Sequence, residues 1–448
     1  MRLRIALLIL LVSLLPRVWL FVADLNHQDR WFTPDSAGYR DLGRNLLHGR
    51  VFSQADKPPY FLDFERVPVY PLFVAGVFAA SGDREWAVVL AQILLSAATC
   101  WLLYLTARRV VGEKWALAAA LAQALSLSSI VACQFLLTET LFTFLLAVQL
   151  WLAFRYKERG GIRVLILAGV VLGLMTLCRP ISLLWIIPQC FILLCETRVL
   201  FPRRLFHVAL SVLIFAATVF PWYLRNRIQD GAWFLTTNTG YTLFMHNVAA
   251  LEARRTGQSA EALRAEWNRE TEAEFAAHTD RYRAAHEQNA YRVRRARALI
   301  RRAPLLYARL HFQPYILLPN ITAFFELIGQ TQPHRGTLDV LNRQGLAAAA
   351  RHYFGDRAWL VAFVAPWIAL LGLIYLGVCL GLARWLAQRR WIELLFFLAF
   401  AVYYLLLPGP VTLPRYREPA MPMMILTAAA GFAWVFARRG PAPPGKNA

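Results

Sequence analysis

The chain has 448 residues, of which 58% are hydrophobic and only 17% are charged. Soluble proteins carry about 25% charged residues, so the composition excludes an ordinary soluble enzyme and indicates a membrane protein. The formal net charge of +21 does not indicate a nucleic-acid partner, because many basic residues stand in short clusters between apolar runs, as the positive-inside rule requires. The six cysteines fall within apolar runs without CxxC or Cys/His metal spacing, which is typical of small core residues.

The first apolar run, 5–23, follows the basic start MRLR and has no convincing small-residue cleavage site. We interpret it as an uncleaved anchor whose N-terminus lies in the cytoplasm. Further runs near the ~20 residues that cross hydrocarbon bring the total to about ten spans. These runs lie at 86–107, 115–133, 135–155, 162–178, 180–196, 205–222, 358–382, 390–407 and 419–437.

The run 68–80 is shorter than the others and is flanked by Pro and Gly. It predicts a helix that enters or lies on the membrane without crossing it. The sequence therefore predicts an all-α, polytopic membrane protein.

Alternate loops between the spans carry the basic clusters, among them ARRVVGEK, RYKERGGIR and ARWLAQRR. This alternation predicts that both termini are cytoplasmic and that the loops 24–85 and 223–357 lie outside. We expect an N-terminal transmembrane module over 1–222, C-terminal spans over 358–437 and a disordered cytoplasmic tail over 438–448.

The second outer loop, 223–357, is expected to be mostly helical. Its part 259–302 is rich in Ala, Glu and Arg with sparse apolar residues, which predicts two amphipathic helices, the second ended by Pro304. The part 305–325 is apolar and aromatic but is broken by Pro314 and Pro319, so it predicts packing at the interface and no span.

The first outer loop contains the most polar stretch of the N-terminal third, 31–72. Asp35 and Tyr39 follow Thr33-Pro34 and would share one face of a helix that starts there. Asp35 is a candidate catalytic carboxylate, although an ordinary charge at a helix N-terminus has the same pattern. The pair Glu65-Arg66 precedes a stiff turn with Tyr70, which suits either phosphate binding by arginine or an ordinary interfacial anchor.

Other candidates lie at outer ends of spans, where the positive-inside rule disfavours arginine. Glu139, in LLTETLF, is predicted to start the fourth span. Together the arginines predict an anion held at the outer membrane surface, and we expect Arg66, Arg225 and Arg417 to line one cavity. The outer-side candidates are Arg179 in CRP, Arg225-Asn226 in PWYLRNR, and Arg415 and Arg417 in LPRYREP.

PDSAGYRDLGRNLLHGRVF followed by ERVPVYPLFVA resembles the first outer loop of GT-C membrane glycosyltransferases. The resemblance is to the branch with bacterial relatives of protein O-mannosyltransferases and lipid A aminoarabinose transferases. LLTETLF, LCRPISLL, PWYLRNRIQDGAWFLTTNTGYTLFMHN and LPRYREPAMPMM follow in the order that family shows. The resemblance implies a bacterial inner-membrane enzyme with a periplasmic active site. Such an enzyme transfers a sugar, with inversion, from a polyprenyl-phosphate donor to a lipid, glycan or protein acceptor.

The resemblance also implies roles for individual residues. Asp35 matches the first-loop aspartate that serves as the base, and Glu139 stands where a second acid is found. Glu65-Arg66 is similar to the acidic and basic pair near the donor phosphate. Asn238 and Asn247 match the asparagine- and glycine-rich stretch after PWxxRN, where His246 replaces a more usual small residue. No ligand spacing requires a metal, although a divalent ion bound through Glu65, Glu139 or a histidine would suit the residues.

A lipid-linked-sugar flippase or transporter is the alternative function. It would show inverted repeats and ionisable residues near the middle of the membrane, and the sequence shows neither. A purely structural membrane subunit would leave the acidic and arginine-bearing first loop without an explanation.

Overall fold

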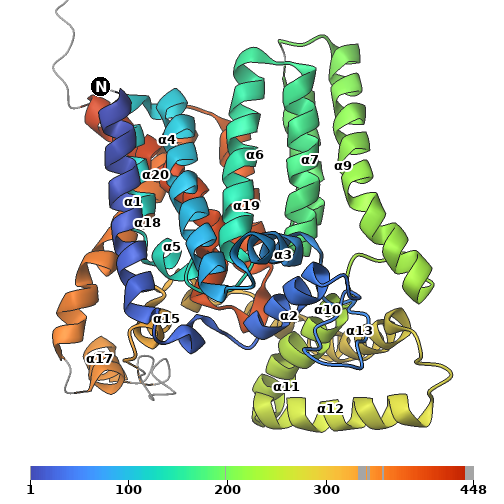
Figure 1. Cartoon of the computed structure of the whole chain (residues 1–448). Helices are drawn as coiled ribbons and strands as arrows, with labels where there is room; N and C mark the ends of the chain where they lie inside the picture. Colours follow the sequence, from blue (N-terminus) through green and yellow to red (C-terminus); the bar gives the residue numbers. More distant parts are fainter. Residues whose placement is uncertain (1, 197, 331–339, 341–343, 356–357, 439–448) are drawn as a thin grey trace, which may run out of the picture.

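The computed structural model describes residues 2–196, 198–330, 340, 344–355 and 358–438, and every regular element within these ranges is helical. The helices of the membrane part stand side by side in Figure 1, and the shorter helices of the two outer loops gather at one end of them. The prediction of an all-α, polytopic membrane protein is confirmed. The helices of the membrane part are α1 (Arg2–Asp24), α4 (Glu85–Ala124), α5 (Leu127–Ala132), α6 (Glu139–Arg159), α7 (Ile162–Cys178), α8 (Ile186–Leu194), α9 (Phe201–Asp230), α18 (Ala358–Ala387), α19 (Trp391–Ala401) and α20 (Met421–Arg438).

Five helices in the described ranges are long and apolar enough to cross a membrane, fewer than the predicted count of about ten. Two of the other predicted spans are interrupted by turns of different geometry. The 3-10 helix η2 (Pro180–Trp185) precedes α8, and the π-helix η5 (Val402–Leu406) follows α19. The five candidate spans are Leu3–Asp24, Glu85–Ala124, Phe201–Asp230, Trp359–Ala387 and Pro414–Ala437.

The longest helix, α4, covers the predicted span 86–107 and the first half of the predicted span 115–133, which continues into α5. As a straight helix of 40 residues it would be about 60 Å long, twice the thickness of the hydrocarbon core. Gly112 breaks it with a φ of 78° and a ψ of 175°, a conformation that glycine adopts without strain. The break falls between the predicted spans 86–107 and 115–133. The helix α9 is longer than its predicted span, because it continues past the predicted boundary at residue 222 to Asp230.

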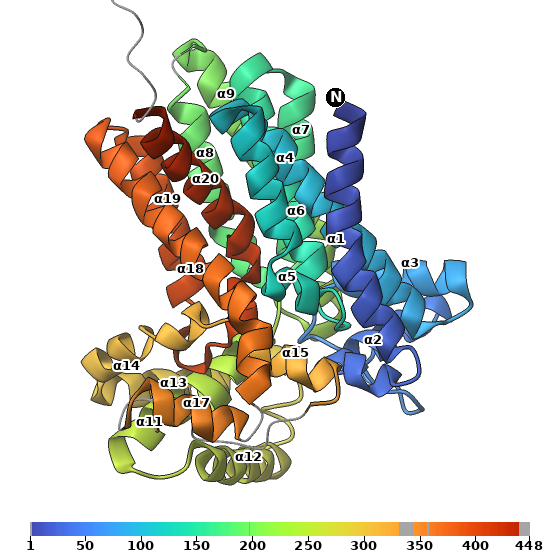
Figure 2. The same cartoon turned by 90° about the vertical axis from the view of Figure 1, so that its left-hand side faces the viewer.

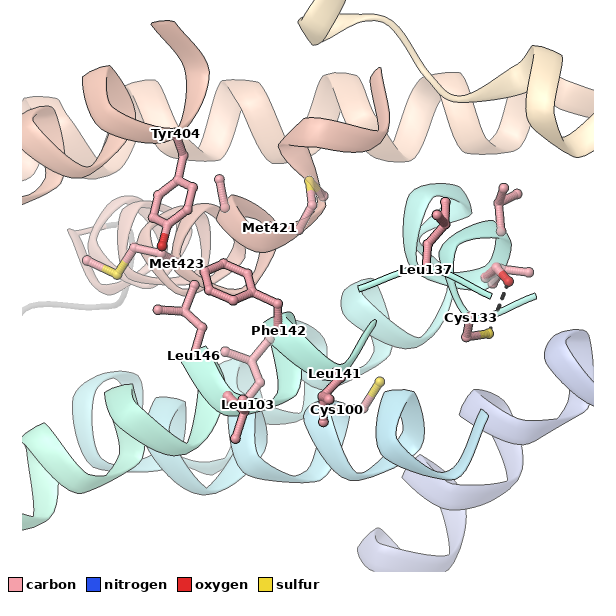
Figure 3. Packing of buried hydrophobic residues seen from close by; sticks show 14 of the residues in the cluster. Cys100, Leu103, Cys133, Leu137, Leu141, Phe142, Leu146, Tyr404, Met421 and Met423 are labelled. Atoms are coloured by element: carbon pink, nitrogen blue, oxygen red, sulfur yellow. Dashed lines mark hydrogen bonds between the residues drawn. The ribbon is translucent and has the colours of Figure 1, made fainter. Parts of the chain in front are cut away.

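Helices that are distant in sequence form the core of the membrane part. α4 packs against α1, α6 and α20, while α7 packs against α6 and α9 (Figures 1 and 2). Figure 3 shows buried side chains of α4, α6, η5 and α20 meeting in this core, among them Leu103, Phe142, Leu146, Tyr404 and Met423.

Glycines allow the closest contact between the C-terminal helices α18 and α20. A Cβ atom at Gly431 would lie 2.4 Å from the carbonyl oxygen of Gly377 and 2.4 Å from the backbone nitrogen of Gly381. Small residues at such crossings let the backbones of membrane helices approach each other.

The outer loops form a layer below the spans in Figure 1. In the first loop, α2 (Ser36–Leu47) packs against α3 (Val69–Ser81), which is the predicted short helix at 68–80. In the second loop, the predicted amphipathic pair is α12 (Ala260–Ala277) and α13 (Ala285–Arg302). α13 ends before Pro304, as predicted. The remaining helices are η1 (Gln28–Trp31), α10 (Asn238–Tyr241), η3 (Thr242–Val248), α11 (Ala249–Thr256), α14 (Pro304–Leu310), η4 (Pro314–Leu317), α15 (Ile321–Leu327), α17 (Leu346–Phe354), η6 (Gly409–Val411) and η7 (Pro414–Ala420).

The start of α1 and the end of α20 lie at the same end of the molecule, opposite the outer loops (Figure 2). This arrangement agrees with two termini on one side of the membrane. Of the predicted tail 438–448, only Arg438 lies within the described residues.

Candidate active site

Asp35 stands immediately before α2, at the helix start that the sequence predicts. Its side chain makes no capping hydrogen bond to the helix. The Thr33 backbone N–H donates to Ser36 Oγ at 2.9 Å. The Asp35 carboxylate accepts a hydrogen bond from Arg66 Nη2 at 2.8 Å and lies 3.7 Å from Arg415 Nη2. With 42% of its side chain exposed, this carboxylate faces arginines and solvent rather than its own helix.

Arg66 is fixed from two sides. Its backbone N–H donates to Asp63 Oδ1 at 2.7 Å, and its guanidinium lies over the Tyr39 ring, 4.9 Å from the centroid. Burial by itself would lower the pKa of Arg66. The neighbouring Tyr39 and Asp35 side chains raise this pKa by more than burial lowers it, so the net shift is upward. The buried Nε atom has no hydrogen-bond partner.

The aromatic support of Arg66 continues into the membrane part. The Tyr39 and Tyr70 rings meet edge to face at 5.0 Å, and Tyr70 Oη donates to Gln92 Oε1 at 2.8 Å. Gln92 Nε2 then donates to the carbonyls of Cys133 and Phe135. This chain of contacts links α2 and α3 to α4 and to the turn that precedes Glu139.

Glu139 is the first residue of α6, as predicted, and is only 4% exposed. Its Oε1 atom lies 3.2 Å from Arg179 Nη1 and 3.8 Å from Arg415 Nε. Arg415 therefore lies between the two carboxylates, Asp35 on one side and Glu139 on the other.

The charges of this cluster leave an excess of one positive charge, since Arg66, Arg179 and Arg415 face Asp35 and Glu139. Arg66 Nε is buried without a hydrogen-bond partner, whereas Arg179 Nη1 and Arg415 Nε lie beside Glu139 Oε1. Buried polar groups normally find such partners, and arginine is suited to phosphate because its planar fork binds two oxygens. The cluster can therefore take up an anion.

Arg225 lies beside this cluster and not in it, as far as the described contacts show. Its Nη1 atom donates to the Asp63 carbonyl at 2.9 Å and to Asn226 Oδ1 at 2.8 Å. Its guanidinium lies 4.6 Å from the centroid of the Phe64 ring. The fully buried Asn226 donates to the Phe234 carbonyl at 2.9 Å, which holds the chain after α9.

Both terminal nitrogens of Arg417 donate to protein groups, although its Nε atom has no hydrogen-bond partner. Arg417 is 1% exposed, and its Nη1 atom donates to the carbonyls of Ile316 and Leu318 at 2.6 and 2.8 Å. The described contacts thus group Arg66 with Arg179 and Arg415, in place of the predicted group with Arg225 and Arg417. The reason is the 3-10 geometry of η7, which has about three residues per turn, so side chains two positions apart point in different directions.

The remaining predicted residues lie where the two outer loops meet. The Glu65 carbonyl accepts from Thr236 Oγ1 at 2.6 Å. Burial raises the pKa of the Glu65 carboxyl, which interacts electrostatically with Arg66 and Arg292. Asn238 begins α10 and accepts from Thr242 Oγ1 at 3.3 Å. Asn247 is 9% exposed, and its Oδ1 atom has no hydrogen-bond partner.

His246 stands among these groups of the second loop. Its ring contacts Arg264 at 3.4 Å and meets the Tyr241 ring edge to face at 5.7 Å. Burial lowers the pKa of His246, and Arg264 lowers it further. The negative charge of Asp35 opposes this lowering of the pKa of His246.

Three residues escaped the sequence interpretation. The Asp63 side chain accepts from the backbone N–H of Arg66, and the Asp63 carbonyl accepts from Arg225. An aspartate three residues before the N–H that it binds is a local turn pattern, and this pattern would have indicated the role of Asp63. Arg292 faces Glu65 and has no sequence signal. Arg17 lies in the first apolar run, is fully buried, and donates to the carbonyls of Ser13 and Ala124 at 2.7 Å.

Among the residues that the structure describes, no group of three or more His, Cys, Asp or Glu side chains is placed to hold a metal ion. Whether a divalent ion acts through Glu65, Glu139 or a histidine stays a prediction.

Comparison with known proteins confirms the resemblance stated from the sequence. The family model described as "Dolichyl-phosphate-mannose-protein mannosyltransferase" matches residues 56–223, a segment that contains Glu65, Arg66, Glu139 and Arg179 but neither Asp35 nor Arg415. No curated protein matches the chain.

Two solved structures of ArnT from Cupriavidus metallidurans are similar to the chain. The structure bound to undecaprenyl phosphate has a TM-score of 0.40 and 17% identity, covering 93% of this chain and 77% of that one. The structure in the apo state has a TM-score of 0.39 and 15% identity, covering 93% and 76%.

Proposed function

We propose that this chain is an inverting GT-C glycosyltransferase of the bacterial inner membrane. It transfers a sugar from a polyprenyl-phosphate donor to a lipid, glycan or protein acceptor on the periplasmic side. The observation that carries the proposal is the position of Arg415, whose guanidinium lies between the carboxylates of Asp35 and Glu139. The family match over residues 56–223 supports the same class of reaction.

The arginines supply the electrostatic part of the reaction. The bond between the anomeric carbon and the phosphate oxygen breaks, and the departing polyprenyl phosphate gains negative charge. Preorganised donors in a site with little water stabilise such a charge strongly. Three guanidinium groups, from Arg66, Arg179 and Arg415, stand against only two carboxylates. The excess positive charge would stabilise the phosphate.

Asp35 is the general base of the proposed reaction. The acceptor hydroxyl attacks the anomeric carbon from the face opposite the phosphate, and its proton passes to the carboxylate. Asp35 suits this role because 42% of its side chain is exposed and its Oδ2 atom is held only loosely, 3.7 Å from Arg415.

Glu139 acts differently in this proposal. It is 4% exposed and lies beside Arg179 and Arg415, so an acceptor hydroxyl has little access to it. Its charge holds the two guanidinium groups toward the donor phosphate. Glu139 is therefore a positioning residue, and it becomes the candidate base only if Asp35 fails.

The test is transfer by the purified full chain in lipid nanodiscs. Labelled polyprenyl-phosphate sugars are supplied with lipid, glycan and peptide acceptors, and the product is identified by mass spectrometry. Transfer with inversion at the anomeric carbon supports the proposal. Movement of the labelled lipid between the leaflets of vesicles, without transfer to any acceptor, would instead support the flippase alternative.

A further inference from the structure

The segment from the end of α13 to η4 carries positive charge that the protein does not neutralise. Between Glu287 and Glu326 the sequence contains no acidic residue. Arg301 and Arg302, in the last turn of α13, and Arg309, in α14, are exposed. None of the three forms an ion pair with any residue that the structure describes.

The same segment exposes large apolar side chains. Leu305 is 77% exposed and Phe312 is 69% exposed, while Leu317 and Leu318 are 41% and 39% exposed. These residues lie outside the helices that qualify as spans, so the hydrocarbon core around a span does not account for them.

Hydrogen bonds hold this segment against the membrane part. His311 Nδ1 contacts the carbonyl of Leu406, the last residue of η5, at 2.9 Å. Tyr375 in α18 donates to the Leu317 carbonyl at 2.6 Å, and Arg417 donates to the carbonyls on either side of Leu317. In Figure 2, α14 lies at the edge of the molecule just below the spans, and α12 lies further below.

We propose that residues 301–318 form a lipid-binding surface, called here the α14 surface, that docks on the outer leaflet. Leu305 and Phe312 enter the boundary between head groups and acyl chains, and Arg301, Arg302 and Arg309 bind the phosphates of anionic phospholipids. Basic residues beside exposed apolar residues are the pattern of interfacial anchors, and charge complementarity selects anionic lipids as the ligand. The surface would fix the second loop over the membrane independently of the proposed enzymatic function.

Binding of fluorescent phosphatidylglycerol and fluorescent phosphatidylcholine to the detergent-purified full chain tests this proposal. We expect tighter binding of phosphatidylglycerol, by roughly fivefold for each arginine that contacts it, with a preference that falls as salt is added. The triple variant Arg301→Gln, Arg302→Gln, Arg309→Gln should lose the preference. The matched control is Arg269→Gln, an exposed arginine of α12, which should keep it.

A second measurement needs no variant. Hydrogen exchange of the amides in 304–318 is followed in nanodiscs of phosphatidylcholine with and without phosphatidylglycerol, and slower exchange with the anionic lipid supports the proposal. A triple variant that keeps the lipid preference would overturn it. Protection that depends on protein concentration and not on lipid charge would also overturn it, because a second copy of the chain would then cover the surface.

Discussion

Asp35 gives the sharpest test at the scale of single residues. Asp35→Asn keeps the shape of the side chain and its hydrogen bond from Arg66 but cannot accept a proton. General-base catalysis contributes about a hundred- to ten-thousandfold, so we expect kcat to fall by that order while the donor Kd changes little. The two quantities are measured by single-turnover transfer and by donor binding.

The control for this variant is Asp29→Asn, an exposed aspartate of the same outer loop, which should leave kcat unchanged. If Asp35→Asn inserts correctly, binds the donor and retains nearly normal turnover, Asp35 is not the base and Glu139→Gln becomes the next variant to measure.

Arg415 tests which arginines hold the donor phosphate. Hydrogen bonds to charged groups contribute about 1.5–3 kcal/mol, so Arg415→Ala should weaken donor binding about ten- to a hundredfold. Arg415→Lys should restore only part of the loss, because an ammonium group cannot form the bidentate contact. The donor Kd is measured in nanodiscs by displacement of a labelled polyprenyl phosphate.

Arg417→Ala is the informative comparison for Arg415. The Arg417 guanidinium donates to the carbonyls of Ile316 and Leu318 at 2.6 and 2.8 Å. Arg417→Ala should therefore lower the melting temperature more than Arg415→Ala, which removes only longer contacts of 3.7 and 3.8 Å. Equal donor affinities for wild type and Arg415→Ala would remove this arginine from the proposed phosphate site.

At the scale of elements, glycines decide how closely α18 and α20 approach. A Cβ at Gly431 would lie 2.4 Å from backbone atoms of α18, whereas a Cβ at Gly372 of α18 would meet nothing within 4 Å. Gly431→Ala should therefore push the helices apart and cost about 1–3 kcal/mol, as overpacking does. Gly372→Ala should be neutral or slightly stabilising, because alanine favours a helix by up to about 1 kcal/mol over glycine.

Thermal unfolding of the two glycine variants in the same detergent measures this difference. A Gly431→Ala protein that melts at the wild-type temperature would mean that α18 and α20 do not pack as closely as described.

At the scale of the whole molecule, the basic loops predict the orientation in the membrane. Reporter fusions at Lys157 and at Arg389 should report a cytoplasmic location. Both residues belong to basic segments on the same side of the membrane as the N-terminus. Fusions at Gln258 and at Asp280, in the second outer loop, should report the opposite compartment. A fusion at Lys157 that reports the outside would reverse the assignment and place Asp35 on the cytoplasmic side.

The sequence by itself determined the class of the protein and the positions of several helices. Hydrophobic run length and charge alternation are local properties, so 68–80 was recognised as the short helix that the structure bounds at Val69–Ser81. Glu139 was recognised as the start of α6, and a helix was predicted to start at Thr33-Pro34, close to the observed start of α2 at Ser36, because helix starts have local patterns. The break at Gly112 falls in the predicted gap between 86–107 and 115–133. The interruptions by η2 and η5 were not predicted, since apolar composition does not distinguish α-helical turns from 3-10 or π turns.

Only the tertiary structure decided which charged residues meet. Arg415 and Arg417 look equivalent in the sequence, yet one contacts Asp35 and Glu139 while the other binds carbonyls of η4. Their partners come from segments distant in the sequence, and the packing of α6, α7 and η7 brings the segments of Glu139, Arg179 and Arg415 together. The contacts of an ionisable side chain depend on this packing and on the turn geometry beneath it, which no local pattern in the sequence encodes.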